Sequence, residues 1–173
     1  LGLSYPANSN WRMWALAKAG RIDVVQREWR EKWATMASVQ QNNTLQESWE
    51  VQPDSNSQWS HCPVAPLFLA FMGIAGLQPL APGFGRVLVR PQPGELKEVE
   101  LTAHTVRGPI RFRSEGRRGA RRITLQLPAG MAGILELPAA ESVELPLLEG
   151  ASAGWRWYRL PEGKELQLSL KEV

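Results

Sequence analysis

The segment Gln78-Pro79-Leu80-Ala81-Pro82-Gly83-Phe84-Gly85 divides the chain into two parts with different hydrophobic periodicity. Proline and glycine are the residues that most strongly interrupt helices and strands. Apolar residues before the segment recur at helical spacing, and those after it alternate as in strands. We therefore expect a helical domain over residues 1–77 and a strand-rich domain over residues 78–173. Because the connecting segment is short, the two are expected to pack together.

Short alternating runs, separated by turn residues, follow the segment. In Ile110-Arg111-Phe112-Arg113 and Ile123-Thr124-Leu125-Gln126-Leu127, apolar and polar side chains alternate. Similar runs lie at 86–90, 98–102, 134–137, 143–145, 155–160 and 166–170. Turn residues such as Pro93-Gly94 lie between them. About eight short strands with no intervening helices predict an antiparallel β-sandwich.

The part before the segment shows helical patterns at 10–19, 23–36 and 63–75. Asn8 or Ser9 is expected to cap the first helix, and Gly20 and Gly76 are expected to follow the ends of the first and third. Four tryptophans at helical spacing are interpreted as core residues: Trp11, Trp14, Trp29 and Trp33. The sequence thus predicts an α+β chain of two domains.

The composition is that of a folded globular protein. Hydrophobic residues make up 43% and charged residues 21% of the 173 residues, a balance typical of packed domains. The chain begins Leu1-Gly2-Leu3, without an initiator Met or a signal-peptide pattern. We therefore expect a fragment of a longer protein, and the sequence leaves its localisation open.

Several functional classes are disfavoured. The uncharged run from Cys62 to Leu80 contains prolines and glycines that predict a buried helix and no membrane span. The net charge of +3 comes from arginines beside Gly116 and Gly119, in a predicted hairpin turn without the interleaved aromatics of a nucleic-acid site. His61, Cys62 and His104 lack the spacing of zinc ligands. No glycine-rich phosphate loop is present, so we expect no metal and no cofactor.

The segment around Glu47 and Glu50 combines carboxylates with large aromatics. Glycosidic bond cleavage requires two carboxyl groups, and the faces of Trp49 and Trp59 are suited to sugar rings. His61 completes the set of candidate residues. Other roles stay open from the residues alone. Thr44 and Glu47 also have capping-box spacing, Glu50 could be a solvated carboxylate, and His61 could be a structural residue.

Several motifs together resemble the C-terminal region of bacterial α-L-rhamnosidases, glycoside hydrolase family 78. They are Asn43-Thr44-Leu45-Gln46-Glu47-Ser48-Trp49, Ser57-Gln58-Trp59-Ser60-His61-Cys62, Gly76-Leu77-Gln78-Pro79-Leu80-Ala81-Pro82-Gly83-Phe84, Val89-Arg90-Pro91-Gln92-Pro93-Gly94-Glu95-Leu96 and His104-Thr105-Val106-Arg107-Gly108-Pro109-Ile110. Their order and spacing match through most of the chain.

This resemblance implies that residues 1–77 are the last helices of an (α/α)6 toroid, followed by a C-terminal antiparallel β-sandwich. It also implies an inverting mechanism with Glu47 as general base, and a sugar pocket that includes His61. Gln46 departs from the family pattern, which often has Trp before the base. The general acid would lie upstream of this chain. The implied partners are a rhamnoside-type carbohydrate and the upstream part of the same protein, against which the chain would pack.

Two other interpretations remain. The chain could be a non-catalytic carbohydrate-binding or structural module, in which Trp155 and Trp157 share one side of a strand. An exposed pair would form a sugar platform, whereas a buried pair, the favoured alternative, would belong to the core. The chain could also derive from a relative that kept the toroid and lost the chemistry.

Overall fold

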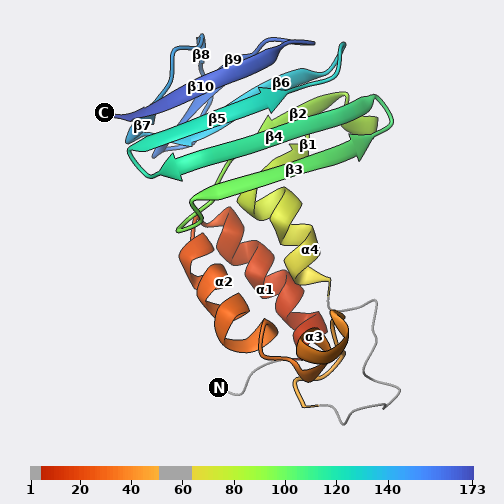
Figure 1. Ribbon diagram of the computed structural model, residues 1–173. Coiled ribbons are helices and arrows are strands. Elements are labelled where there is room, and N and C mark those ends of the chain that lie inside the picture. Colours follow the sequence, from red (N-terminus) through yellow and green to blue (C-terminus); the bar gives the residue numbers. More distant parts are fainter. Residues whose placement is uncertain (1–4, 51–63) are drawn as a thin grey trace. The chain divides into compact units, whose positions relative to one another are not determined.

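The computed structural model of the chain describes residues 5–50 and 64–173 (Figure 1). Contacts between Cα atoms divide the chain into two compact units, Leu1–Gly73 and Ile74–Val173. The first, the helical unit, contains helices. The second, the sandwich unit, contains the strands. The overall combination of helices followed by a sandwich agrees with the fold class that the sequence predicts.

The helical unit is built around α1, which contacts both α2 and α4 (Figure 1). Its α-helices are α1 (Pro6–Lys18), α2 (Ile22–Glu28), α3 (Ala37–Asn42) and α4 (Ala65–Leu69), and π-helical turns continue α2 as η1 (Trp29–Trp33) and α4 as η2 (Ala70–Ile74). Met13, Val25 and Leu69 are fully buried between these helices. The face of α1 that is buried carries Met13 and Ala17 at helical spacing, and it is not the face of Trp11 and Ala15.

The helix boundaries differ from the predicted ones. The first helix begins at Pro6, where the missing N–H costs no hydrogen bond. Asn8 and Ser9 consequently lie inside the helix and cap nothing, and the Ser9 hydroxyl donates to the carbonyl of Tyr5 at 3.2 Å. The predicted helix 23–36 runs from Ile22 to Trp33 and so ends three residues early, and α3, which begins at Ala37, was not predicted.

The sandwich unit consists of two five-stranded sheets, each a separate layer in Figure 1. The first sheet has the order β1-β2-β6-β9-β8 and the second the order β3-β4-β5-β10-β7. The strands are β1 (Leu77–Pro79), β2 (Arg86–Val89), β3 (Glu98–Thr105), β4 (Gly108–Arg117), β5 (Ala120–Gln126), β6 (Ala132–Pro138), β7 (Glu141–Ser142), β8 (Leu147–Leu148), β9 (Trp155–Leu160) and β10 (Glu165–Glu172). A short 3-10 turn, η3 (Pro82–Phe84), separates β1 from β2.

The prediction of a purely antiparallel sandwich is wrong in one place. Strands β2 and β6 pair in parallel, with Val87 beside Gly133. After β2 the chain forms β3, β4 and β5 in the other sheet and then returns beside β2 in the same direction. A parallel pair requires such a long crossover. The other strand pairs in the described residues are antiparallel.

Two further predictions need correction in the sandwich unit. The connecting segment contributes a strand, since β1 pairs with β2 through Leu77 and Val89. Residues 143–145, predicted as a strand, lie between the two-residue strands β7 and β8. Both strands sit at sheet edges, where short strands limit pairing with other chains.

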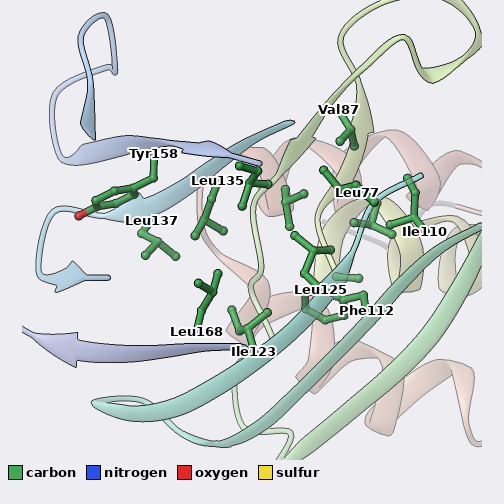
Figure 2. Packing of buried hydrophobic residues seen from close by; sticks show 14 of the residues in the cluster. Leu77, Val87, Ile110, Phe112, Ile123, Leu125, Leu135, Leu137, Tyr158 and Leu168 are labelled. Atoms are coloured by element: carbon green, nitrogen blue, oxygen red, sulfur yellow. The ribbon is translucent and has the colours of Figure 1, made fainter. Parts of the chain in front are cut away.

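The core of the sandwich lies between the facing sheets. Figure 2 shows Leu135 and Leu137 from the first sheet opposite Ile123, Leu125 and Phe112 from the second, and all five are essentially buried. Gly133 permits this packing, because a Cβ there would lie 2.7 Å from Leu127 Cδ1. The alternation of side chains along each strand thus directs one face of each sheet into this core.

No helix among the described residues is long and apolar enough to cross a membrane.

Candidate functional site

The residues predicted for catalysis and sugar binding fall in and beyond the segment after α3. Glu47 and Glu50 are solvent-exposed, and Trp49 is partly buried. Trp59 and His61 lie outside the described residues. Residues 44–50 form no helix, so the capping-box alternative for Thr44 and Glu47 is wrong. Glu47 instead lies on a bend with its carboxylate open to solvent.

A set of hydrogen bonds ties this bend to the start of α3. The chain turns back at Asn43, whose backbone is left-handed with φ of 54°. The Ser38 hydroxyl then donates to the carbonyl of Thr44 at 2.8 Å. The Thr44 N–H donates in turn to the carbonyl of Ser38 at 3.2 Å. The first residues after the helix are thereby fixed to its first turn.

Gln46 makes the remaining connections, and the sequence did not suggest them. Its side chain is 1% exposed. Its Oε1 accepts the Ser38 N–H at 2.9 Å, and its Nε2 donates to the carbonyls of Ser48 at 2.8 Å and Trp49 at 2.9 Å. The amide thus spans the bend that carries Glu47. Its position directly before Glu47 was the available signal, but its burial depends on the fold.

The tryptophans of the helical unit have different environments. Trp33 is 2% exposed and packs edge-to-face on Trp49, with ring centroids 5.4 Å apart. Trp14 packs in the same manner on Phe68 at 5.1 Å. The interpretation of Trp33 as core is confirmed. For Trp11 it is wrong, because this side chain is 78% exposed.

Trp11 borders an apolar groove on the helical unit. The groove has a volume of about 280 Å³ and is lined by Asn10, Trp11, Trp14, Val64, Ala65 and Phe68. Next to it on α4, Leu67 is 63% exposed. Large apolar side chains that gather on one exposed face are typical of an interaction surface.

The second aromatic pair of the sequence lies on the outer face of the first sheet. Leu135 and Tyr158 point into the core, so their neighbours Glu136 and Trp157 point outward. Trp157 Nε1 donates to Glu136 Oε1 at 2.7 Å, and the Arg90 guanidinium stacks 3.7 Å above the Trp155 ring. Both tryptophans are partly buried. They are therefore neither part of the sandwich core nor a bare sugar platform.

Arg90 and Glu136 form an ion pair beside these rings. Arg90 Nε lies 3.2 Å from Glu136 Oε2 with side chains only 12% and 9% exposed, although its N–H makes no hydrogen bond within the described residues. Burial lowers the pKa of Arg90, and the Glu136 carboxylate opposes that shift. The cluster links β6 and β9 to the residue that follows β2.

The outer face of the second sheet is polar and solvated. Arg113 pairs there with Glu98 at 2.8 Å and Glu115 at 3.0 Å, and Arg111 bonds Gln126 at 3.1 Å. These contacts suit a solvated face, as predicted for the basic region. Arg121 is the exception, because it is 6% exposed and bonds the carbonyl of Leu96 at 3.3 Å. Burial lowers its pKa.

On the sandwich, the exposed carboxylates of Glu98, Glu100 and Glu115 pair with Arg113, whereas Glu47 and Glu50 lie exposed beside Trp49 in the helical unit. Within the described residues, no group of three or more His, Cys, Asp or Glu side chains could hold a metal ion. The Glu47 segment is therefore the candidate site, and its chemistry would be that of carboxylates.

Comparison with known proteins identifies similar chains. Residues 76–151 match the family model described as bacterial alpha-L-rhamnosidase C-terminal domain. No curated protein matches the chain. The alpha-L-rhamnosidase of Streptomyces avermitilis, solved in complex with L-rhamnose, is 23% identical with a TM-score of 0.73. The match covers 92% of this chain and 17% of that one.

A second solved relative has the same fold. The alpha-L-rhamnosidase of Dictyoglumus thermophilum is 17% identical with a TM-score of 0.58, and the match covers 75% of this chain and 16% of that one. The resemblance to α-L-rhamnosidases that the motifs indicated is thereby confirmed, and the family match lies in the strand-rich part. The chain spans about one sixth of the length of either solved relative.

Proposed function

We propose that this chain is the C-terminal part of an inverting glycoside hydrolase that cleaves terminal α-L-rhamnosyl or related deoxy-sugar linkages, with Glu47 as general base. The observation that carries the proposal is the family match over residues 76–151, joined to a fold shared with solved α-L-rhamnosidases. The exposed Glu47 carboxylate on a hydrogen-bonded bend adds support, because a general base must reach water.

In the proposed reaction, Glu47 takes a proton from a water molecule as the water oxygen attacks the anomeric carbon. A carboxylic acid upstream of this chain protonates the leaving glycosidic oxygen. The two carboxyl groups of an inverting enzyme stand about 6.5–9.5 Å apart, which leaves room for that water. Trp49, Glu50, Trp59 and His61 would shape the sugar pocket.

The same proposal assigns residues 1–77 to the last helices of an (α/α)6 toroid and residues 78–173 to a C-terminal sandwich. The apolar groove of about 280 Å³ beside Trp11 supports this assignment. Further helices of the longer protein would cover Trp11 and Leu67. The solved relatives, of which this chain covers one sixth, have enough additional chain to supply them.

The test is the substitution Glu47→Gln in the full-length protein, with Glu50→Gln as the matched control. Loss of a general base costs about 10²–10⁴-fold, so Glu47→Gln should reduce kcat on an aryl α-L-rhamnoside by at least that factor. Glu50→Gln should keep a larger share of the activity. Unchanged turnover by Glu47→Gln, with the melting temperature retained, would refute the role of Glu47.

A non-catalytic module is the second candidate, because the family match covers the sandwich and not the helices. Under this alternative, residues 78–173 would bind rhamnosides by themselves. The engaged rings of Trp155 and Trp157 argue against a free sugar platform on the first sheet. Titration of L-rhamnose into that domain, followed by NMR, separates the two candidates.

A further inference from the structure

Gln46 occupies a position in the fold that a connecting loop does not normally provide. It is a neutral polar residue, 1% exposed, directly before the candidate base. Burial of an amide costs free energy unless its donors and acceptor are used. Here the oxygen accepts one bond and the nitrogen donates two, all between 2.8 and 2.9 Å.

The bond to Ser38 replaces a missing helix cap. The first N–H groups of a helix have no partner inside the helix and are normally satisfied by the side chain of the preceding residue. The residue before α3 is Met36, which makes no capping hydrogen bond. Gln46 Oε1 supplies the acceptor from eight residues downstream of Ser38. The start of α3 and the bend after it therefore depend on the same side chain.

The Gln46 amide nitrogen bonds the backbone on the C-terminal side of Glu47. Both carbonyls that Nε2 bonds, those of Ser48 and Trp49, follow Glu47 directly. The Trp49 ring in turn packs on the buried Trp33. The backbone of Glu47 is thereby held before and after, while its own side chain stays exposed.

We infer that Gln46 is a positioning residue, which fixes the backbone of Glu47 and so the location of the proposed base. This inference rests on the proposed function. A glutamine suits the role because it combines an acceptor with two donor hydrogens at the end of a flexible chain. Leucine offers neither, and glutamate keeps the acceptor and loses the donors when ionised.

The test compares Gln46→Leu with Gln26→Leu in the full-length protein. Gln26 is a second glutamine of the helical unit, 4% exposed in α2, so both variants remove a buried amide. A misplacement of about 1 Å can cost 10²-fold in rate. We expect Gln46→Leu to lower kcat on an aryl α-L-rhamnoside about 100-fold with KM within threefold. Gln26→Leu should lower the melting temperature and leave kcat within threefold.

Two further measurements test the inference, and the first keeps it testable if Gln46→Leu does not fold. Gln46→Glu keeps the shape and the acceptor but loses the two donor hydrogens when ionised. We expect it to lower kcat with KM within threefold, because the carbonyls of Ser48 and Trp49 lose their bonds. Hydrogen exchange at the Ser38 amide should accelerate in Gln46→Leu, but not in Gln46→Glu, which keeps the acceptor, nor in Gln26→Leu.

Each outcome distinguishes this inference from the proposed function. Equal kcat for Gln46→Leu and Gln26→Leu, with Glu47→Gln inactive, would overturn the positioning role and leave the base in place. Full activity of Glu47→Gln would overturn the proposed function itself. Wild-type kcat for Gln46→Glu would also contradict the inference.

Discussion

The two units differ in how completely they bury their apolar side chains and pair their buried polar groups. In the sandwich unit, large apolar residues of both sheets face one another and are fully buried. Its exposed ones, Leu80, Val106, Leu147 and Val173, lie after β1, at a turn, in an edge strand and at the chain end. In the helical unit, Trp11 and Leu67 lie beside a single groove. The sandwich therefore encloses its core, whereas the described helices leave an apolar face exposed.

Buried polar groups show the same difference. In the sandwich, Arg121 bonds a backbone carbonyl and the Ser114 hydroxyl, and Glu136 accepts the Trp157 N–H. In the helical unit, Glu28 Oε1, Trp29 Nε1 and Trp33 Nε1 are buried without a hydrogen bond within the described residues. Arg90 Nε in the sandwich shares this state, although its guanidinium forms an ion pair with Glu136. None of α1 to α4 has a capping side chain at its N-cap residue. The comparison suggests that the helical unit needs further protein around it.

The largest effect should come from separating the units. We expect residues 74–173 alone to unfold cooperatively with heat, because their core is complete. Residues 1–73 alone should lack a cooperative transition, since short helices need tertiary packing. Near-ultraviolet circular dichroism and differential scanning calorimetry measure both. A cooperative transition for residues 1–73 in isolation would contradict the comparison.

The sequence predicted the sandwich better than the helices. The alternation of apolar and polar residues in Ile110–Arg113 and Ile123–Leu127 is a local pattern with a period of two residues. Strands β4 and β5 confirm the prediction made from it. The parallel pairing of β2 with β6 was missed, because it depends on which sheet the intervening strands join. Strand pairing across the chain leaves no mark in local periodicity.

The candidate site was predicted only in part. The Glu47 segment could be found from its residue types, whereas the role of Gln46 could not, since its partner Ser38 is eight residues away. Arg90 was noted only within a family motif, and its ion pair with Glu136 requires the fold. The roles of Trp59 and His61 stay predictions. Residue types therefore pointed to the candidate carboxylates Glu47 and Glu50, but not to the hydrogen bonds that fix the backbone around Glu47.

An intermediate effect should come from the cluster on the first sheet. Trp157→Phe keeps an aromatic ring at this position and removes the indole N–H that donates to Glu136 at 2.7 Å. Loss of a hydrogen bond to a charged, largely buried group costs about 1.5–3 kcal/mol. Trp155→Phe is the matched control, because Arg90 contacts its ring face and a phenyl ring retains much of that contact. Urea denaturation of residues 74–173 measures both. Equal losses in the free energy of unfolding for the two variants would show that the hydrogen bond from Trp157 to Glu136 does not stabilise the domain.

The smallest effect should come from Glu141, and it depends on pH. Burial raises the pKa of Glu141, Arg118 and Arg121 oppose the rise, and Glu172 adds to it from the position opposite in register on β10. A raised pKa means that the folded state holds the proton more tightly than the unfolded chain, so ionisation at neutral pH destabilises the fold. Glu141→Gln should therefore increase the melting temperature at pH 7, by a few degrees at most, because it removes the ionised form of this side chain.

This gain should vanish below the ordinary pKa of glutamate, about 4.3, where Glu141 is protonated in both the folded and the unfolded state. Glu144→Gln serves as the control, because its carboxylate is 90% exposed and pairs with Lys171 at 3.1 Å. An exposed ion pair contributes little, so that variant should change the melting temperature slightly and in the opposite direction. Thermal melts of residues 74–173 from pH 3.5 to 7.5 decide the question. A gain for Glu141→Gln that is the same at both ends of this range would show that the buried charge of Glu141 is not its cause.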